Sequence, residues 1–299
     1  MTLCISHNFP FNEAIPFAVC YADSRITVIG TSTEQTSVGR FLPSNKEIKH
    51  QTDSGIKIQI VSAIVVDGDE SYYRDFAFSI AGAVSLGLQS LIYLDSVFKT
   101  FYENYTFEEY IDRIKDTLHE FWKDAWDQEI EYLMTATDDS GEIKIIHIRG
   151  TETNLVFEEV AEENELLFAV IGDHAEEARL KIHQETNSLM CAGMEMPSAL
   201  EVACVRMMRR AIEDQNQIFI GGNIQACQLV GKNVTYLSLD DGCNLLFRGV
   251  KYSRERHDYP RNLNTLDRPP FPILDINQDK YNPQKSIQEI MEQIKVYQS

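Results

Sequence analysis

The sequence predicts an α+β fold, a four-layer αββα sandwich in which two antiparallel β-sheets lie between two helical layers. Three observations predict it. Strand-forming runs and helical stretches follow one another in the order strands, two helices, strands, two helices, strands. The first two helical stretches are amphipathic, so each needs an apolar surface to cover. Single strands do not alternate with single helices, as they would in a parallel doubly wound sheet.

The first half of the chain is predicted to hold five strands and two helices. Runs rich in β-branched and aromatic residues predict the strands, at 2–5, 17–22, 26–30, 56–66 and 76–80. A first helix begins near Ala83. A second begins at Thr106, where Thr106 and Glu109 have the spacing of a capping box. The uncharged stretch from 76 to 94 is therefore a strand that runs into a helix, and not a membrane span.

The second half repeats this order. Strands are predicted at 132–137, 143–148, 155–158 and 166–171, and helices over 174–185 and from Ser198. Three more strands follow at 224–229, 234–239 and 244–247. We expect one sandwich domain over residues 1–249. Residues 250–299 are predicted to form a proline-rich extension with a short helix over 286–296.

Composition limits the partners and the chemistry. The formal net charge of −19 argues against a nucleic acid or an anionic membrane as partner, because both are bound by clustered Lys and Arg. The six cysteines include no Cys-x-x-Cys pair and no grouping with histidine, so the sequence indicates no metal site and no cofactor. The first twenty residues lack the basic start of a signal peptide, which predicts a cytoplasmic protein.

Thr2, which directly follows Met1, is the strongest candidate for a catalytic residue. A threonine that becomes the first residue carries a nucleophilic hydroxyl and, in its α-amine, a base with a reference pKa of about 7.7–8.0. A lysine beside it, such as Lys57, would favour the alkoxide and lower the pKa of that amine. Asp23 would then hold the lysine in place. We expect the Thr2 side chain to lie in an open cleft.

These residues, in their order, resemble the proteasome-type peptidases of the N-terminal nucleophile (Ntn) hydrolase superfamily, both the 20S proteasome β-subunits and bacterial proteasomes. The resemblance covers roughly residues 2–239. It is carried by the Met1-Thr2 start, the turn Ala22-Asp23-Ser24-Arg25, Lys57-Ile58 opening a strand, Ala81-Gly82 before a helix, the turn at 138–141, Ile171-Gly172 entering a helix, and Gly221-Gly222. The fold that the resemblance implies is again the αββα sandwich.

The resemblance implies roles for particular residues. Thr2 is the nucleophile, and Asp23, Arg25 and Lys57 are its partners. The backbone near Gly82 stabilises the oxyanion. Lys46 and Lys49 remain alternatives to Lys57 as the catalytic lysine beside Thr2.

The sequence also departs from the pattern of this family. The first hairpin is enlarged by residues 7–16, and a second insertion lies between Asp23 and Lys57. Asp173 stands in the supporting shell where many members have a serine. Near Gly221, Ile220 and Gln217 stand at other usual serine and aspartate positions.

Two functions follow as expectations. The first is a threonine peptidase or amidohydrolase that uses Thr2 after removal of Met1 on a peptide or amide bond. The second is a catalytically inactive subunit that serves assembly or binding. The resemblance also implies a homo-oligomeric ring or a related self-assembly.

Overall fold

The computed structural model describes most of the chain between residues 2 and 276. The described residues are 2–8, 16–35, 41–52, 55–67, 70–100, 104–123, 129–151, 154–162, 166–214, 220–240, 244–248, 250–253 and 273–276. Gln217 and the predicted helix over 286–296 lie outside them.

Within the described residues, the larger sheet has eight strands. Seven follow one another as β10-β1-β2-β11-β12-β13-β14, and β15 pairs with β12. The pairs are antiparallel except for β12 and β15, which run parallel. The strands are β1 Leu3–Asn8, β2 Phe17–Asp23, β10 Phe168–Gly172, β11 Ile224–Val230, β12 Asn233–Asp240, β13 Asn244–Phe247, β14 Val250–Ser253 and β15 Ile273–Asp275.

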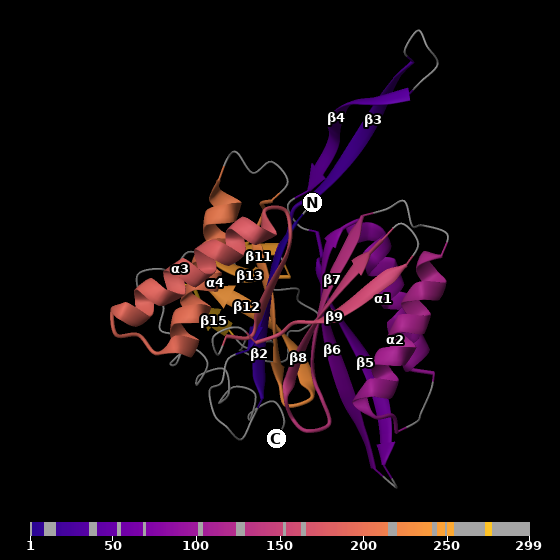
Figure 1. The fold of residues 1–299 in the computed structure, drawn as a ribbon, viewed down its shortest axis with the longest axis vertical. Coiled ribbons are helices and arrows are strands. Elements are labelled where there is room, and N and C mark those ends of the chain that lie inside the picture. The colour runs from indigo at the N-terminus through magenta and orange to yellow at the C-terminus, as the bar shows by residue number, and fades with distance from the viewer. Residues whose placement is uncertain are drawn as a thin grey trace.

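The smaller sheet is an antiparallel meander in which each strand pairs with the next one along the chain. Its strands are β5 Ile58–Asp67, β6 Glu70–Gly82, β7 Ile130–Thr137, β8 Ile143–Gly150 and β9 Leu155–Glu159. The strands β3 Ile26–Gln35 and β4 Phe41–Thr52 pair only with each other among the described strands, and this hairpin extends away from both sheets (Figure 1).

The described helices cover the two sheets from opposite sides (Figure 1). Helices α1 Val84–Phe98 and α2 Phe107–Trp122 pack on the smaller sheet, and α3 Ala175–Cys191 and α4 Met196–Glu213 pack on the larger one. Each helical pair shares a buried apolar cluster with its sheet. A third cluster joins the two sheets and contains many small side chains, including Cys4, Ala18, Cys20, Ala77 and Cys227. Small side chains let two sheets approach closely, because little volume separates their backbones.

Local sequence explains where α2 begins. The Thr106 hydroxyl accepts a hydrogen bond from the Glu109 N–H at 3.3 Å, and the Glu109 carboxylate accepts one from the Thr106 N–H at 2.8 Å. This is the predicted capping box, which satisfies backbone donors that the first turn leaves unpaired. The helix then buries one stripe, which includes Ile114, Leu118 and Trp122.

The structure confirms the α+β class and differs from the prediction in three places. The insertion between Asp23 and Lys57 forms the β3–β4 hairpin. Strand β14 adds to the larger sheet from the predicted extension, and β15 pairs in parallel with β12. The boundary between domains at residue 249 stays a prediction. The uncharged stretch from 76 to 94 is the end of β6 followed by α1, and no described helix is both long and apolar enough to cross a membrane.

Candidate active site

Thr2 lies at the start of β1, held by the chain that follows β10. Its carbonyl oxygen accepts a hydrogen bond from the Asp173 N–H at 2.7 Å. Gly172 has a left-handed φ of 95°, and a Cβ added to it would lie 1.7 Å from the Thr2 oxygen. That backbone conformation favours glycine, and the close approach excludes any side chain. Gly172 is therefore the residue that allows Thr2 to come this close to the turn.

The Thr2 side chain is fully buried, with a relative exposure of 0%. The structure thus differs from the expected open cleft, because Thr2 begins a strand that is flanked by β10 on one side and β2 on the other. The Thr2 hydroxyl has no hydrogen-bond partner among the described residues. A buried hydroxyl without a partner costs about 1–3 kcal/mol, so this threonine does not serve stability. Ser6, Ser79 and Thr135 share this property, so the neighbourhood of Thr2 must distinguish it.

Asp23 ends β2 and its carboxylate is fully buried. Its Oδ1 accepts a hydrogen bond from the Leu3 N–H at 3.0 Å. Its Oδ2 accepts bonds from the Arg25 N–H at 3.2 Å and from the Gly221 N–H at 3.1 Å. Three backbone donors from three segments therefore hold this carboxylate in place, directly beside the residue that follows Thr2.

Lys57 completes a buried ion pair with Asp23. Its ammonium Nζ lies 2.9 Å from both carboxylate oxygens, and both side chains have 0% exposure. Desolvation makes such a pair costly unless its geometry is good and further hydrogen bonds support it. Of the three candidate lysines, Lys57 is thus the one that meets Asp23. Lys46 and Lys49 lie on β4, in the separate hairpin.

Gln225 on β11 fixes the pair, and sequence reasoning missed it. Its Nε2 donates to the carbonyl oxygens of Asp23 at 3.1 Å and Gly55 at 2.7 Å. Its Oε1 accepts from the Lys57 N–H at 3.1 Å. One buried amide thereby joins the segment that carries the carboxylate to the segment that carries the ammonium. The only signal in the sequence was a polar residue inside an apolar strand.

Arg25 faces a different part of the site from the one expected. Its guanidinium donates to the Ile220 carbonyl at 3.3 Å, and a Cβ on Gly221 would lie 2.3 Å from its Cζ. The Ser24 and Arg25 N–H groups both donate to the Gly221 carbonyl, at 3.2 and 3.1 Å. Arg25 therefore braces the 220–221 segment, whose N–H in turn holds Asp23.

Gly82 offers a backbone donor that points toward this cluster. The Ala83 N–H donates to the backbone carbonyl of Glu129, on the β7 side, at 2.8 Å. The Ile80 N–H donates to the Lys57 carbonyl, on the opposite side, at 2.9 Å. Because alternate residues of a strand direct their backbone groups to opposite neighbours, the Gly82 N–H points to the same side as that of Ile80. No described residue accepts it. It is thus an unpaired donor on the Lys57 side of β6.

A cavity of about 360 Å³ adjoins this point. Its lining includes Gly82 and Gly172 and four charged residues, Glu129, Glu131, Arg149 and Asp173. Burial raises the pKa of Asp173, although the positive amino end of the chain and His174 act against this. The imidazole of His147, whose Nε2 lies 3.5 Å from the Glu131 carboxylate, lowers the pKa of Glu131 despite its partial burial. Glu131 is therefore the more readily ionised of the two.

Comparison with known proteins corrects the family assignment. Neither a family model nor a curated protein matches this sequence. An Anbu protein is among the similar solved structures, so the assignment to proteasome-type peptidases is wrong. Short motifs such as a glycine between a strand and a helix reflect backbone geometry, which many α+β proteins need, and they carry little information about family.

Three of the similar solved structures are Anbu proteins. The Gly-1 mutant of Anbu from Hyphomicrobium sp. strain MC1 has a TM-score of 0.51 at 12% identity, over 88% of this chain and 91% of that one. Anbu, the ancestral beta-subunit, from Yersinia bercovieri has a TM-score of 0.46 at 10% identity, over 77% and 83%. The helical assembly of the Anbu complex from Pseudomonas aeruginosa has a TM-score of 0.48 at 12% identity, over 90% and 98%. The chain therefore shares the overall fold of the Hyphomicrobium Anbu protein.

Proposed function

We propose that this protein is an amidohydrolase acting on peptide bonds, with the Thr2 hydroxyl as nucleophile after removal of Met1. The carrying observation is the buried, unpartnered hydroxyl of Thr2 directly before β1, one residue before Leu3, whose N–H binds the Asp23 carboxylate of the Asp23–Lys57 ion pair. Leu3 and Lys57 bind the same carboxylate, so Asp23 ties the start of the chain to the lysine. The order of helices, sheet, sheet and helices supports an αββα sandwich of the Ntn-hydrolase type.

The proposed chemistry uses groups of the chain and one water molecule. The neutral α-amine of Thr2 takes the hydroxyl proton while the oxygen attacks the amide carbon. The Lys57 ammonium favours the deprotonated oxygen and keeps the amine neutral by its charge. The tetrahedral intermediate carries an oxyanion, for which the unpaired Gly82 N–H is the proposed donor.

The intermediate then collapses. The amine returns its proton to the leaving nitrogen, the carbon–nitrogen bond breaks, and an ester on Thr2 remains. Water attacks this ester with the same amine as base, which releases the acid and restores the hydroxyl. In this scheme Asp23, Arg25 and Gln225 act only by holding Lys57 and the surrounding backbone.

Asp173 has a supporting role in the proposal. Its N–H binds the Thr2 carbonyl, and one oxygen of its carboxylate, Oδ2, is buried without a partner among the described residues. We assign to Asp173 the orientation of the Thr2 amine.

Intact-mass spectrometry after exposure to a peptide epoxyketone tests the proposal, because this electrophile reacts with both the hydroxyl and the amine of an N-terminal threonine. The expected result is a protein that lacks Met1 and gains one adduct, which the Thr2→Ala variant does not gain. A protein that keeps Met1 and gains no adduct would contradict the assignment.

One observation favours a second candidate, an inactive subunit that serves assembly. Thr2 has no exposed surface in the chain that keeps Met1, so its hydroxyl cannot meet a substrate while Met1 is retained. Large apolar side chains on the helical layers also face solvent, notably Ile92 at 52%, Tyr93 at 47% and Leu180 at 61% exposure. We expect such residues to support self-assembly through the helical layers, in a ring or another form. Light scattering would show a monomer if this expectation is wrong.

A further inference from the structure

β10 is an edge strand whose free edge can be identified residue by residue. It pairs with β1 and with no other described strand. The Asn8 N–H donates to the Leu167 carbonyl at 3.0 Å, and the Asp173 N–H donates to the Thr2 carbonyl at 2.7 Å. Alternate residues of an antiparallel strand bond to the same neighbour. The odd-numbered residues of this segment therefore bond to β1, and Phe168, Val170 and Gly172 direct their backbone groups away from it.

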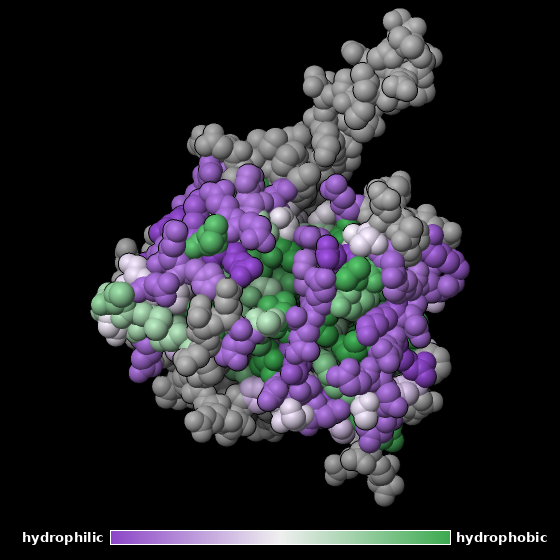
Figure 2. All heavy atoms as spheres, in the orientation of Figure 1, coloured by the Kyte–Doolittle hydropathy of each residue, from purple (hydrophilic) through white to green (hydrophobic). Residues whose placement is uncertain are grey.

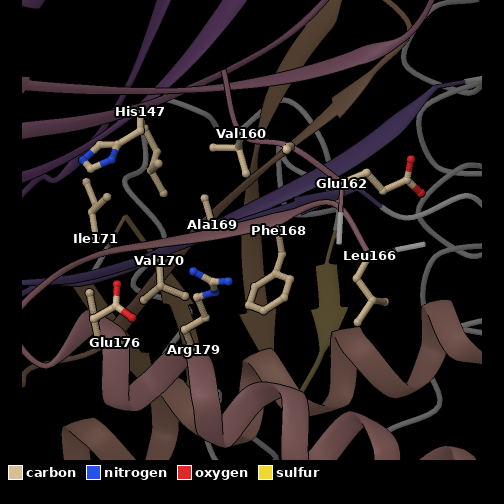
Figure 3. Close-up of a pocket in the computed structure, with 13 residues that line it drawn as sticks. His147, Val160, Glu162, Leu166, Phe168, Ala169, Val170, Ile171, Glu176 and Arg179 are labelled. Carbon is tan, nitrogen blue, oxygen red and sulfur yellow. The ribbon is translucent and has the colours of Figure 1, made fainter. Parts of the chain in front are cut away.

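This free edge opens into a cavity of about 420 Å³. The cavity is lined by four consecutive residues of β10, from Phe168 to Ile171. Successive side chains of a strand point to opposite faces, so a cavity that touches all four runs along the backbone edge. Figure 3 shows this arrangement, with Arg179 of α3 on one side of the strand and His147 of β8 near its Ile171 end.

The edge is open where the cavity lies and capped where it ends. No described residue accepts or donates a hydrogen bond at the outward backbone groups of Phe168 or Val170. The outward N–H of Gly172 is different, because the Glu131 carboxylate accepts it at 3.0 Å. The Glu131 side chain, from the smaller sheet, thus binds the Gly172 N–H. It takes the place that a backbone carbonyl of an added strand would have there.

The two cavities follow one another along this segment. The larger one ends at Ile171, and the smaller one begins at Gly172 and Asp173, which contact the Thr2 carbonyl. A chain lying along the edge of β10 would therefore end at Glu131, beside the turn that binds the Thr2 carbonyl. In the orientation of Figure 1, apolar surface is exposed in the hollow between the α3–α4 layer and the smaller sheet (Figure 2).

We propose that an extended peptide segment of the substrate adds as a strand to the free edge of β10. Phe168 and Val170 each present one N–H and one C=O, a pattern that recognises a peptide backbone and that a small amide cannot match. Unpaired strand edges are the sites where proteins add a further strand. That the added segment belongs to a substrate rests on the proposed function. The substrates would then be unfolded polypeptides.

Val170 provides a direct test, because its N–H points away from β1. Val170→Pro removes this donor without removing any bond to β1, and proline is tolerated at strand edges. Val170→Ala is the matched control, since it shortens the side chain and keeps the donor. Both changes are made in the Thr2→Ala protein, which cannot cleave the probe. The probe is fluorescein-labelled β-casein, an unfolded polypeptide, and binding is measured by fluorescence anisotropy.

The expected result is that the Thr2→Ala protein binds casein. Adding Val170→Pro weakens binding at least tenfold, and adding Val170→Ala changes it less than threefold. Absence of binding to the Thr2→Ala protein would overturn the proposal, as would equal binding by the two double variants. Because no nucleophile is present, these outcomes do not depend on the epoxyketone experiment.

Hydrogen exchange covers the case in which Val170→Pro fails to fold. With casein present, the amides of residues 168–172 in the Thr2→Ala protein should exchange at least fivefold more slowly. Unchanged exchange in this segment would also overturn the proposal.

Discussion

Two buried ionic clusters lie along the same pair of strands, and they differ in one respect. In the first, Asp23 at the end of β2 pairs with Lys57 at the edge of the other sheet. In the second, Glu201 of α4 binds His7 of β1 at 2.6 Å and also accepts a hydrogen bond from the Tyr21 hydroxyl of β2. All five side chains have 0% exposure.

The second cluster has a partner for every polar atom. His7 Nε2 meets the Glu201 carboxylate, and its Nδ1 lies 2.9 Å from the Asn8 carbonyl oxygen. Both ring nitrogens face oxygen atoms that can accept a hydrogen bond, an arrangement that favours the protonated ring. The Asp23 carboxylate of the first cluster is likewise satisfied, but the hydroxyl of Thr2, the residue before its donor Leu3, is not. A complete network indicates a structural role, and an unsatisfied group next to one indicates chemistry.

Removing Lys57 should have the largest effect. Lys57→Met keeps the stem and leaves the Asp23 carboxylate buried without its counter-ion, so the free energy of unfolding should fall by about 3–5 kcal/mol. Adduct formation should also be lost. Urea unfolding measures the first effect. The control is Lys99→Met, which breaks a surface pair with Asp95 and should cost less than about 1 kcal/mol. Equal losses in the two variants would contradict the importance of the buried pair.

Changing Glu201 should separate the two clusters. Glu201→Gln removes the charge and leaves one donor of His7 or Tyr21 poorly matched, so stability should fall by about 1.5–3 kcal/mol. Epoxyketone adduct formation by the folded fraction should stay as in the wild type. Adduct formation measured by mass, after correction for the folded fraction, checks this. A loss like that of Lys57→Met would mean that both clusters serve the chemistry.

His7 should give the second cluster a pH dependence of its own. Burial alone would lower the pKa of His7, but the hydrogen bond and charge of Glu201 outweigh it and raise that pKa. A raised folded-state pKa contributes stability that is fully present below the unfolded value of about 6.5 and is lost as pH rises through the folded value. Urea midpoints measured from pH 5 to 9 should show this decline. His7→Gln should remove it, and an unchanged slope would argue against the charged pair.

Thr2 should show the smallest effect on stability and a complete effect on chemistry. Thr2→Val replaces the unpartnered hydroxyl by a methyl group, so the free energy of unfolding should stay the same or rise slightly. The matched control is Thr186→Val, because the buried Thr186 hydroxyl donates to the Ile182 carbonyl at 2.8 Å. Differential scanning calorimetry should show a lower Tm only for the control. A lower Tm for Thr2→Val would indicate a structural hydroxyl.

Local sequence signals predicted the helices and strands well. Contacts between residues far apart in the sequence could not be predicted, because they depend on how the strands pair. The capping box at Thr106 and Glu109 depends on residues three apart, and it is found as predicted. Gln225 clamps two segments far from it in sequence, and no local pattern announces such a contact. The closeness of Gly172 to Thr2 likewise follows from the pairing of β1 with β10.

The candidate site was predicted in part. The structure brings Asp23 and Lys57 together as expected, and it places Arg25 against the 220–221 segment. Their catalytic roles, with those of Gly82 and Asp173, stay predictions. The burial of Thr2 could not be predicted, because it depends on the order of strands in the sheet. The family assignment failed because its motifs describe turns and strand ends, which physical constraints impose on many folds.

The position of β1 between β10 and β2 also determines when β1 can be enclosed during synthesis of the chain. Leu3 pairs with Gly172, so β10, the strand that flanks β1, is synthesised long after β1 has left the ribosome. At about 5–20 residues per second, this interval is on the order of ten seconds or more. An aminopeptidase that is to uncover Thr2 can reach Met1 during this interval, before β10 docks. Maturation of the proposed enzyme thus requires that Met1 is removed before β10 pairs with β1.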